Sequence, residues 1–224
     1  MFSRIAAKYD LANRWMTWGQ DVKWRQEVLK KAQLPAGGRV LDIGTGTGDL
    51  ARQAIQLDKS LFIVGADLTL QMMHVGRQQS TGECVVWLCT DILDLPFQAG
   101  SFDVVISGYL VRNVIDIQRA LAEQYRVLKW GGRMVCLDTT PPPADFFHLP
   151  VRLYLRLLIP LIGGGITGNR KAYTYLSDST QTFLQAEELE NCLTNAGFGE
   201  VGFRRFMGGV IAIHWGTKQP KSSD

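Results

Sequence analysis

The sequence predicts an α/β protein whose core is a mostly parallel seven-stranded sheet with helices on both faces, the Rossmann-like arrangement. From residue 39 to about residue 139, short apolar segments rich in β-branched residues alternate with segments of helical period. The first apolar segment runs directly into a glycine turn, Gly44-Thr-Gly-Thr-Gly48, and a helical segment follows. In parallel sheets, such junctions build ligand sites at the carboxyl ends of the strands. We therefore expect a ligand site where the first strand ends.

The individual elements follow from the spacing of apolar residues. Residues 1–37 are expected to form an N-terminal helical extension, in which Trp24, Val28, Leu29 and Ala32 recur at helical spacing. Strands are expected at residues 39–43, 61–66, 84–89, 102–107, 133–138, 200–206 and 209–216. Helices are expected at residues 47–57, 70–79, 116–128 and 185–196. With 224 residues, the chain from 1 to 224 fits a single domain.

An apolar insert at residues 141–182 interrupts this alternation after the fifth strand. Its most apolar part, residues 146–166, is broken by Arg152, Arg156 and Pro160, so it is a poor membrane-spanning helix. Three interpretations remain open. The insert could be a buried core helix, a helix that closes the ligand site, or a lid that accepts a lipid tail and rests on a membrane surface.

Composition excludes several classes of protein. The net charge is only +3 and the basic residues are scattered, which argues against nucleic-acid binding. The four cysteines have no C-x-x-C spacing, and Cys84, Cys89 and Cys136 lie in apolar runs, so we expect reduced core residues. The three histidines lack metal-site spacing, so no metal is expected. The beginning of the chain carries no apolar signal segment, which favours a cytoplasmic location.

The residues around the glycine turn indicate which cofactor the site takes. Asp67 ends the second apolar segment, about 20 residues past Gly48, where a carboxylate can accept both hydroxyls of a ribose. Asp49 occupies the position of the third glycine in the dinucleotide fingerprint, and its carboxylate would repel a pyrophosphate. S-adenosylmethionine (SAM) carries no phosphate but has an ammonium and a sulfonium, so an acidic turn suits it. A tight turn without any ligand is the alternative.

The expected cofactor contacts lie on three strand ends. The segment Asp42-Ile-Gly44-Thr-Gly46 matches E/D-x-G-x-G, which resembles the first motif of class I methyltransferases. Thr47 is expected to cap the following helix. After the third strand, Asp91 can accept from an adenine amino group while Ile92 packs on the ring, although Asp91 could also be a simple loop carboxylate. The expected cofactor contacts are Asp42, Gly44, Thr45, Gly46, Thr47, Asp67, Leu68, Asp91 and Ile92.

Two polar residues follow the fourth strand, where a substrate would lie. Arg112 and Asn113 come just past the carboxyl edge of the sheet. The alternative is structural: Arg112 could form a surface ion pair, and Asn113 could cap the helix that begins near Asp116.

Longer segments carry a resemblance to one family, the ubiquinone/menaquinone biosynthesis C-methyltransferases. The likeness covers nearly the whole chain, in the order in which the family has these segments. Arg112-Asn-Val114 and Ala212-Ile-His214 are far more specific than the glycine turn, which many methyltransferases share. The remaining similar segments are 1–13, 24–25, 40–50, 95–97, 101–103, 115–116, 125–132, 168–176, 208–211 and 216–218.

The resemblance implies a class I methyltransferase fold and SAM-dependent methylation of a ring carbon of a prenylated quinol, with demethylmenaquinol the expected substrate. It also implies that Thr47, Asp67, Asp91 and Ile92 contact the cofactor. The family's Phe-Gly-Leu is replaced by Tyr109-Leu-Val111, a serine by Gly108, and Leu-Glu-Phe-Ser-Lys-Pro by residues 137–142. These departures surround the substrate site, so they bear on which quinol is used.

Catalysis requires the quinol hydroxyl to lose its proton, because this pushes electron density onto the neighbouring ring carbon. The family resemblance implies that Tyr9, Arg112 and Asn113 line the quinol pocket. Arg112, a permanent cation, could stabilise the quinolate, whereas Asp138, Tyr9 and His214 are candidate proton acceptors.

The isoprenoid tail of the quinol suggests peripheral contact of the protein with the inner face of the membrane. A homodimer is compatible with the sequence. The second candidate function is that of an O- or N-methyltransferase for a different hydrophobic substrate, and the third is that of a non-catalytic quinone- or SAM-binding protein. A nicotinamide dehydrogenase ranks last, because the third fingerprint glycine is missing.

Overall fold

The computed structural model describes residues 11, 13–142, 161, 165 and 179–220, and in these residues seven strands form one sheet in the order β3-β2-β1-β4-β5-β7-β6. The first five strands run parallel, and β7 runs antiparallel to both β5 and β6. The strands are β1 (Arg39–Ile43), β2 (Phe62–Asp67), β3 (Val85–Cys89), β4 (Phe102–Gly108), β5 (Leu128–Thr139), β6 (Gly199–Phe206) and β7 (Ile211–Thr217). The Rossmann-like sheet predicted from the sequence is confirmed.

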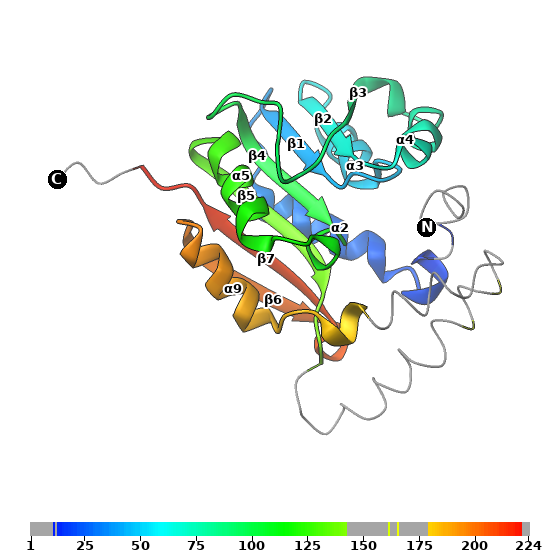
Figure 1. The fold of residues 1–224 in the computed structure, drawn as a ribbon. Helices are drawn as coiled ribbons and strands as arrows, with labels where there is room; N and C mark the ends of the chain where they lie inside the picture. The colour runs from blue at the N-terminus through cyan, green and yellow to red at the C-terminus, as the bar shows by residue number, and fades with distance from the viewer. Residues whose placement is uncertain (1–10, 12, 143–160, 162–164, 166–178, 221–224) are drawn as a thin grey trace.

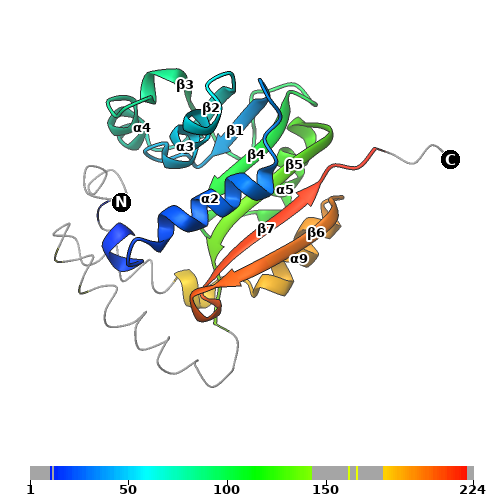
Figure 2. The ribbon, with the colours of Figure 1, turned by 180° about the vertical axis from the view of Figure 1, so that it is seen from behind.

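Helices cover both faces of this sheet, as Figures 1 and 2 show from opposite sides. One face carries α2 (Gln20–Ala32), α3 (Asp49–Leu57) and α4 (Leu70–Arg77). The other face carries α5 (Ile117–Val127) and α9 (Ala186–Asn195). The chain passes from β1 to β2 and β3 on one side and then returns to place β4 on the other side of β1. The carboxyl ends of β1 and β4 therefore flank the point where the strand order reverses, which is where open α/β sheets bind ligands.

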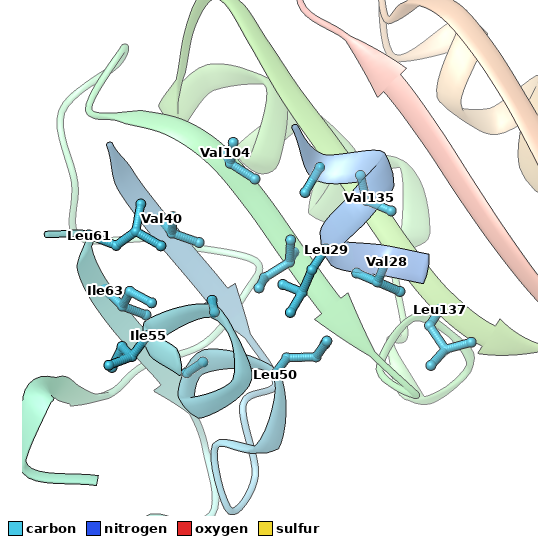
Figure 3. Close-up of a cluster of buried hydrophobic side chains, with 14 of the residues drawn as sticks. Val28, Leu29, Val40, Leu50, Ile55, Leu61, Ile63, Val104, Val135 and Leu137 are labelled. Atoms are coloured by element: carbon cyan, nitrogen blue, oxygen red, sulfur yellow. The ribbon is translucent and has the colours of Figure 1, made fainter. Parts of the chain in front are cut away.

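Each face of the sheet has its own apolar core. Under α2 and α3, side chains such as Val28, Leu29 and Leu50 pack on Val40, Val104 and Val135 of the central strands (Figure 3). Under α5 and α9, a second cluster centres on Phe102, which is fully buried. Alternate side chains of each central strand enter opposite clusters, so the continuous apolar runs in the sequence reflect burial on both faces.

Most predicted elements agree with the structure to within one or two residues. One differs more: β5 begins at Leu128 rather than at residue 133, because Leu128 pairs with Phe102 of β4 beyond a register shift. In the N-terminal extension, α2 contains the predicted helical residues Trp24, Val28, Leu29 and Ala32. The cysteine expectation holds for Cys136, which is buried, but is wrong for Cys84 and Cys89, which are exposed. Apart from Leu161 and Gly165, the segment 146–166 lies outside the described residues. In the part of the chain that the structure describes, no helix is both long and apolar enough to cross a membrane.

Candidate functional site

A cavity of about 300 Å³ opens at the carboxyl ends of β1, β2 and β4. It lies at the reversal of the strand order, as the topology predicts. All nine cofactor contacts predicted from the sequence line it. The same cavity is also lined by Arg25, Ile43, Asp49, Leu50, Ala66, Thr69, Met72, Thr90, Leu93, Leu95, Gly108, Tyr109, Leu110, Asn113, Val114 and Ile115.

The backbone N–H groups of the glycine turn after β1 donate hydrogen bonds within the protein, and these bonds fix the conformation of the turn. Gly44 and Thr45 both donate to the Ala66 carbonyl, at 2.7 and 3.1 Å, and Gly48 donates to Thr45 at 2.7 Å. Gly46 donates to Asp67 Oδ2 at 2.8 Å. The turn needs its glycines because Gly44, Gly46 and Gly48 all have positive φ. With these four donors engaged, the turn offers little to a pyrophosphate.

The helix that follows the turn corrects one expectation about Thr47. Gly48 is the N-cap of α3, and as a glycine it has no side chain that could cap this helix. The prediction that Thr47 caps it is therefore wrong: the turn ends one residue later, because Gly48 adopts the left-handed conformation that the N-cap position takes here. Thr47 is buried and lines the cavity.

Asp42 at the end of β1 presents a carboxylate with one oxygen unengaged. Its Oδ2 accepts from Thr45 Oγ1 at 2.7 Å and from the Ala51 N–H at 3.2 Å. Its Oδ1 is buried and has no hydrogen-bond partner among the described groups. Burial raises the pKa of Asp42 to about 7, partly opposed by the hydrogen bond from Thr45. An unpartnered acceptor at a cavity wall fits a ligand that brings a cationic donor.

Asp67 and Asp91 hold fixed positions at the ends of the next two strands. Asp67 Oδ1 accepts from the Thr69 N–H at 2.7 Å while Oδ2 takes the Gly46 N–H, so both oxygens are oriented by backbone. Asp91 Oδ1 accepts from the Leu93 N–H at 3.0 Å. Ile92 beside it is buried against the apolar core. Each carboxylate oxygen keeps a second lone pair for a ligand hydroxyl or amino group.

The repulsion expected from Asp49 is not what the structure shows. Its carboxylate contacts Arg25 Nη2 at 3.4 Å and is also paired with Arg52. Two guanidiniums therefore neutralise the charge that was expected to exclude a pyrophosphate. The engaged N–H groups of the turn are the better reason why a dinucleotide does not suit this site.

Arg25 is a residue that the sequence reasoning missed. It comes from α2, its side chain is only 6% exposed, and it lines the cavity. The sequence carried a usable signal, because Arg25 shares a helical face with Val28, Leu29 and Ala32. An arginine on an otherwise apolar helix face needs buried partners.

Arg112 and Asp138 form a buried ion pair beyond the described wall of the cavity. Arg112 Nη1 donates to Asp138 Oδ1 at 2.7 Å, and the side chains are 2% and 1% exposed. The interpretation of Arg112 as a surface ion pair is therefore wrong, because β4 and β5 end side by side and place both groups inside. Burial raises the pKa of Asp138, and Arg112 opposes this rise. Arg112 Nε has no partner among the described groups.

Tyr109 lies between the cavity and this ion pair. It lines the cavity, and the Arg112 guanidinium carbon lies 5.2 Å from the centre of its ring. Its φ of 59° is unusual for a residue with a side chain and is typical of functional sites. Asn113 also lines the cavity, and its Nδ2 donates to the Tyr109 carbonyl at 3.1 Å. The helix cap is Asp116, not Asn113.

The two remaining candidate bases are placed differently. His214 is buried against α9, where its Nε2 lies 2.9 Å from the Ala186 carbonyl, and it does not line the cavity. Tyr9 lies outside the described residues. Within the described part of the chain, no cluster of His, Cys, Asp and Glu could hold a metal ion.

His214 gives an expected pH dependence of stability. Nε2 must carry the hydrogen it donates to Ala186, and the buried Nδ1 has no partner among the described groups, so burial lowers the pKa to about 4. Because only the unfolded chain takes up this proton, the contribution of His214 to the free energy of unfolding should fall as pH drops from about 6.5 towards 4. The variant His214→Gln should lose part of this acid sensitivity in urea titrations at pH 4.5 and 7.5. Equal acid sensitivity in parent and variant would contradict this assignment.

Comparisons with known proteins agree with this architecture. A family model described as the ubiE/COQ5 methyltransferase family matches residues 1–218. The "Ubiquinone/menaquinone biosynthesis C-methyltransferase UbiE" of Desulfotalea psychrophila is 45% identical over 218 residues, covering 97% of this chain and 89% of that protein. The "Demethylmenaquinone methyltransferase" of Thermus thermophilus is 41% identical over 220 residues, covering 97% of this chain and 100% of that protein.

Solved structures are similar at the level of the fold alone. A putative methyltransferase of Haloferax volcanii, in complex with its activator Trm112, superposes with a TM-score of 0.71 at 17% identity, covering 98% of each chain. Phosphoethanolamine N-methyltransferase 2 of Haemonchus contortus, in complex with S-adenosyl-L-methionine, has a TM-score of 0.67 at 17% identity. This match covers 94% of the present chain and 56% of the Haemonchus contortus chain.

Proposed function

Because the chain belongs to the ubiE/COQ5 methyltransferase family, we propose that it methylates a ring carbon of a prenylated quinol and converts demethylmenaquinol to menaquinol. The chain is a SAM-dependent methyltransferase of quinone biosynthesis. The observation that carries the cofactor assignment is the unpartnered Oδ1 of Asp42 at a cavity with two further carboxylates that have no arginine or lysine partner among the described residues, Asp67 and Asp91. Such a cavity favours a cationic adenosine compound over an anionic one.

The residues of the cavity fit SAM part by part. Asp42 Oδ1 would accept from the ammonium, and Asp67 would accept from the ribose hydroxyls. Asp91 would accept from the adenine amino group while Ile92 packs against the ring. Gly44, Thr45, Gly46, Thr47 and Leu68 would form the rest of the wall.

When bound, SAM supplies an activated methyl group, so the protein's task is to prepare the ring carbon. The buried N–H of Arg112 Nε, which lacks a partner among the described groups, supports a role as donor to a quinol oxygen. Tyr109 and Asn113, which line the cavity beside it, would orient the ring. Arg112 would then stabilise the negative charge that forms on the quinol oxygen.

Asp138 is the proton acceptor that the geometry favours. Its Oδ1 lies 2.7 Å from Arg112 Nη1. Burial raises the pKa of its carboxyl group, which makes the carboxylate a stronger base. The hydroxyl proton of the quinol would pass to its carboxylate through a water molecule. His214 is a poorer choice, because its Nε2 is committed to the Ala186 carbonyl. Tyr9 stays a candidate that lies outside the described residues.

Apolar residues at the cavity rim support contact with a prenyl tail and a membrane surface. Ile115 lines the cavity and is 98% exposed, and Leu68 beside Asp67 is also exposed. Trp15 and Trp18 are exposed as well, and tryptophan is favoured where one end of a side chain is apolar and the other wet. Ile115 and Leu68 would accept the tail, and the exposed Trp15 and Trp18 would let the protein rest on the membrane that holds the quinol.

Incubation with isotopically labelled SAM and a panel of demethylated naphthoquinols and benzoquinols tests the proposed function. Mass analysis should find one added methyl group on a ring carbon, with a naphthoquinol preferred. The label should survive a mild demethylating treatment that removes O-methyl groups. Label lost in that treatment would favour an O-methyltransferase. Cofactor binding without any transfer would favour a non-catalytic binding protein.

A further inference from the structure

We propose that Arg25 is the receptor for the carboxylate of the cofactor's amino-acid end, so that α2 supplies one half of a clamp whose other half is Asp42. This inference rests on the proposed use of SAM. It assigns a ligand-binding role to the N-terminal helix α2, which lies across one face of the sheet (Figure 2) and contributes Arg25 to the cavity wall.

Two carboxylates hold the Arg25 side chain in place. Its Nη1 donates to Asp21 Oδ2 at 2.6 Å on the same helix, and its Nη2 lies 3.4 Å from Asp49 Oδ2 at the start of α3. Asp21 is itself fully buried and accepts from Thr17 Oγ1 at 3.1 Å. Because two carboxylates hold the guanidinium, the orientation of its plane is fixed. The group also has N–H groups that these two contacts do not use.

Arg25 is also the one cation among the described residues that line the cavity. The wall otherwise carries the acidic side chains of Asp42, Asp49, Asp67 and Asp91. A ligand carboxylate entering this wall would be repelled by Asp67 and Asp91 and attracted by Arg25.

Several backbone N–H groups near Asp42 are already engaged and do not offer a second receptor for an anion. In the glycine turn, the N–H groups of Gly44, Thr45, Gly46 and Gly48 are all engaged within the protein. The Ala51 N–H in the first turn of α3 is taken by Asp42. A side-chain cation is therefore the better receptor for a carboxylate here, and Arg25 and Asp42 line the same cavity. The ammonium and the carboxylate of one amino acid would then meet Asp42 and Arg25 together.

Isothermal titration calorimetry with three adenosine ligands tests this assignment through binding alone. SAM and decarboxylated SAM differ only in the carboxylate, and 5′-methylthioadenosine lacks the amino-acid end altogether. The parent protein should bind SAM roughly 10- to 100-fold more tightly than decarboxylated SAM. In Arg25→Gln this preference should fall to about threefold or less, while the Kd for 5′-methylthioadenosine should stay within about twofold of the parent value.

The matched control is Arg52→Gln. Arg52 also pairs with Asp49 but does not line the cavity, so the preference for SAM should be kept. Arg25→Gln should fold, because Asp21 keeps Thr17 and Asp49 keeps Arg52.

Three outcomes would count against the proposals, and they are distinguishable. An Arg25→Gln protein that keeps the parent preference would overturn the role of Arg25 alone. A parent protein that binds SAM and decarboxylated SAM equally would overturn it without any variant. A parent protein that binds none of the three ligands would instead overturn the proposed function.

Discussion

Asp42→Asn should weaken SAM binding by about 100-fold or more. The amide oxygen can still accept from Thr45 and from the Ala51 N–H, so the turn keeps its shape. The amide NH₂ then takes the place of the unpartnered Oδ1 and faces the cavity as a donor. A donor there would repel an ammonium that the carboxylate attracts. Calorimetric titration with SAM measures the effect.

The pH dependence of the same protein gives a second, independent readout. Burial raises the pKa of Asp42 to about 7, and only the ionised carboxylate attracts a cation. SAM affinity of the parent should therefore rise as pH increases from 5.5 to 7.5, and that of Asp42→Asn should not. A titration curve of the same shape in both proteins would remove Asp42 from the ligand site.

Stability of the ligand-free protein should change in the opposite direction. Because the folded pKa of Asp42 lies above that of the unfolded chain, the contribution of Asp42 to the free energy of unfolding should fall as pH rises from about 4 to 7. The shift corresponds to a loss on the order of 4 kcal/mol. Asp42→Asn should lose this dependence and be at least as stable as the parent at pH 8 in urea titrations. Asp42 thus costs stability that ligand binding recovers.

Arg112→Ala should lower turnover at least about 100-fold and leave SAM affinity within about threefold of the parent value. The second expectation follows because Arg112 does not line the cavity where the cofactor contacts lie. Removal of Arg112 leaves Asp138 as an unpaired buried carboxylate, which should cost roughly 3–5 kcal/mol of stability. This loss should be largest at pH 8 and smaller in acid, where Asp138 is protonated.

A double variant separates chemistry from stability. Replacing both partners, Arg112→Met with Asp138→Leu, removes the unpaired charge, so the free energy of unfolding should recover much of the loss. Turnover should stay low, because neither the cation nor the base is present. If turnover returned with stability, the pair would be a structural element and Arg112 would have no part in methyl transfer.

The sequence predicted the sheet well because each strand carries its own apolar, β-branched signal and each turn its own glycines. It also predicted that Asp42, Asp67 and Asp91 lie at one cavity, since each is at or just after the end of a strand and parallel strands end at one edge. The partners of these groups could not be predicted in the same way. That Arg112 faces Asp138 depends on the register between β4 and β5, which no local pattern encodes.

Arg25 shows the same limit more clearly. Its helix is evident from the spacing of apolar residues, but its place at the cavity depends on how α2 packs across the sheet. Charge compensation is equally non-local. From the sequence alone, the Asp49 carboxylate is expected to repel a pyrophosphate. In the structure its charge is neutralised by Arg25 of α2 and by Arg52 of its own helix.

The attachment of α2 has a consequence for the order in which the protein matures. Lys31 of α2 lies 3.7 Å over the ring of Trp215 in β7, and the Lys31 carbonyl accepts from Arg133 in β5 at 3.3 Å. The helix is therefore synthesised early, but the two strands that make these contacts, β5 and β7, leave the ribosome later. Contacts between such distant segments form slowly. A nascent chain would carry the glycine turn long before the guanidinium of Arg25 is fixed beside it, so competence to hold the methyl donor should appear only after β7 has been synthesised.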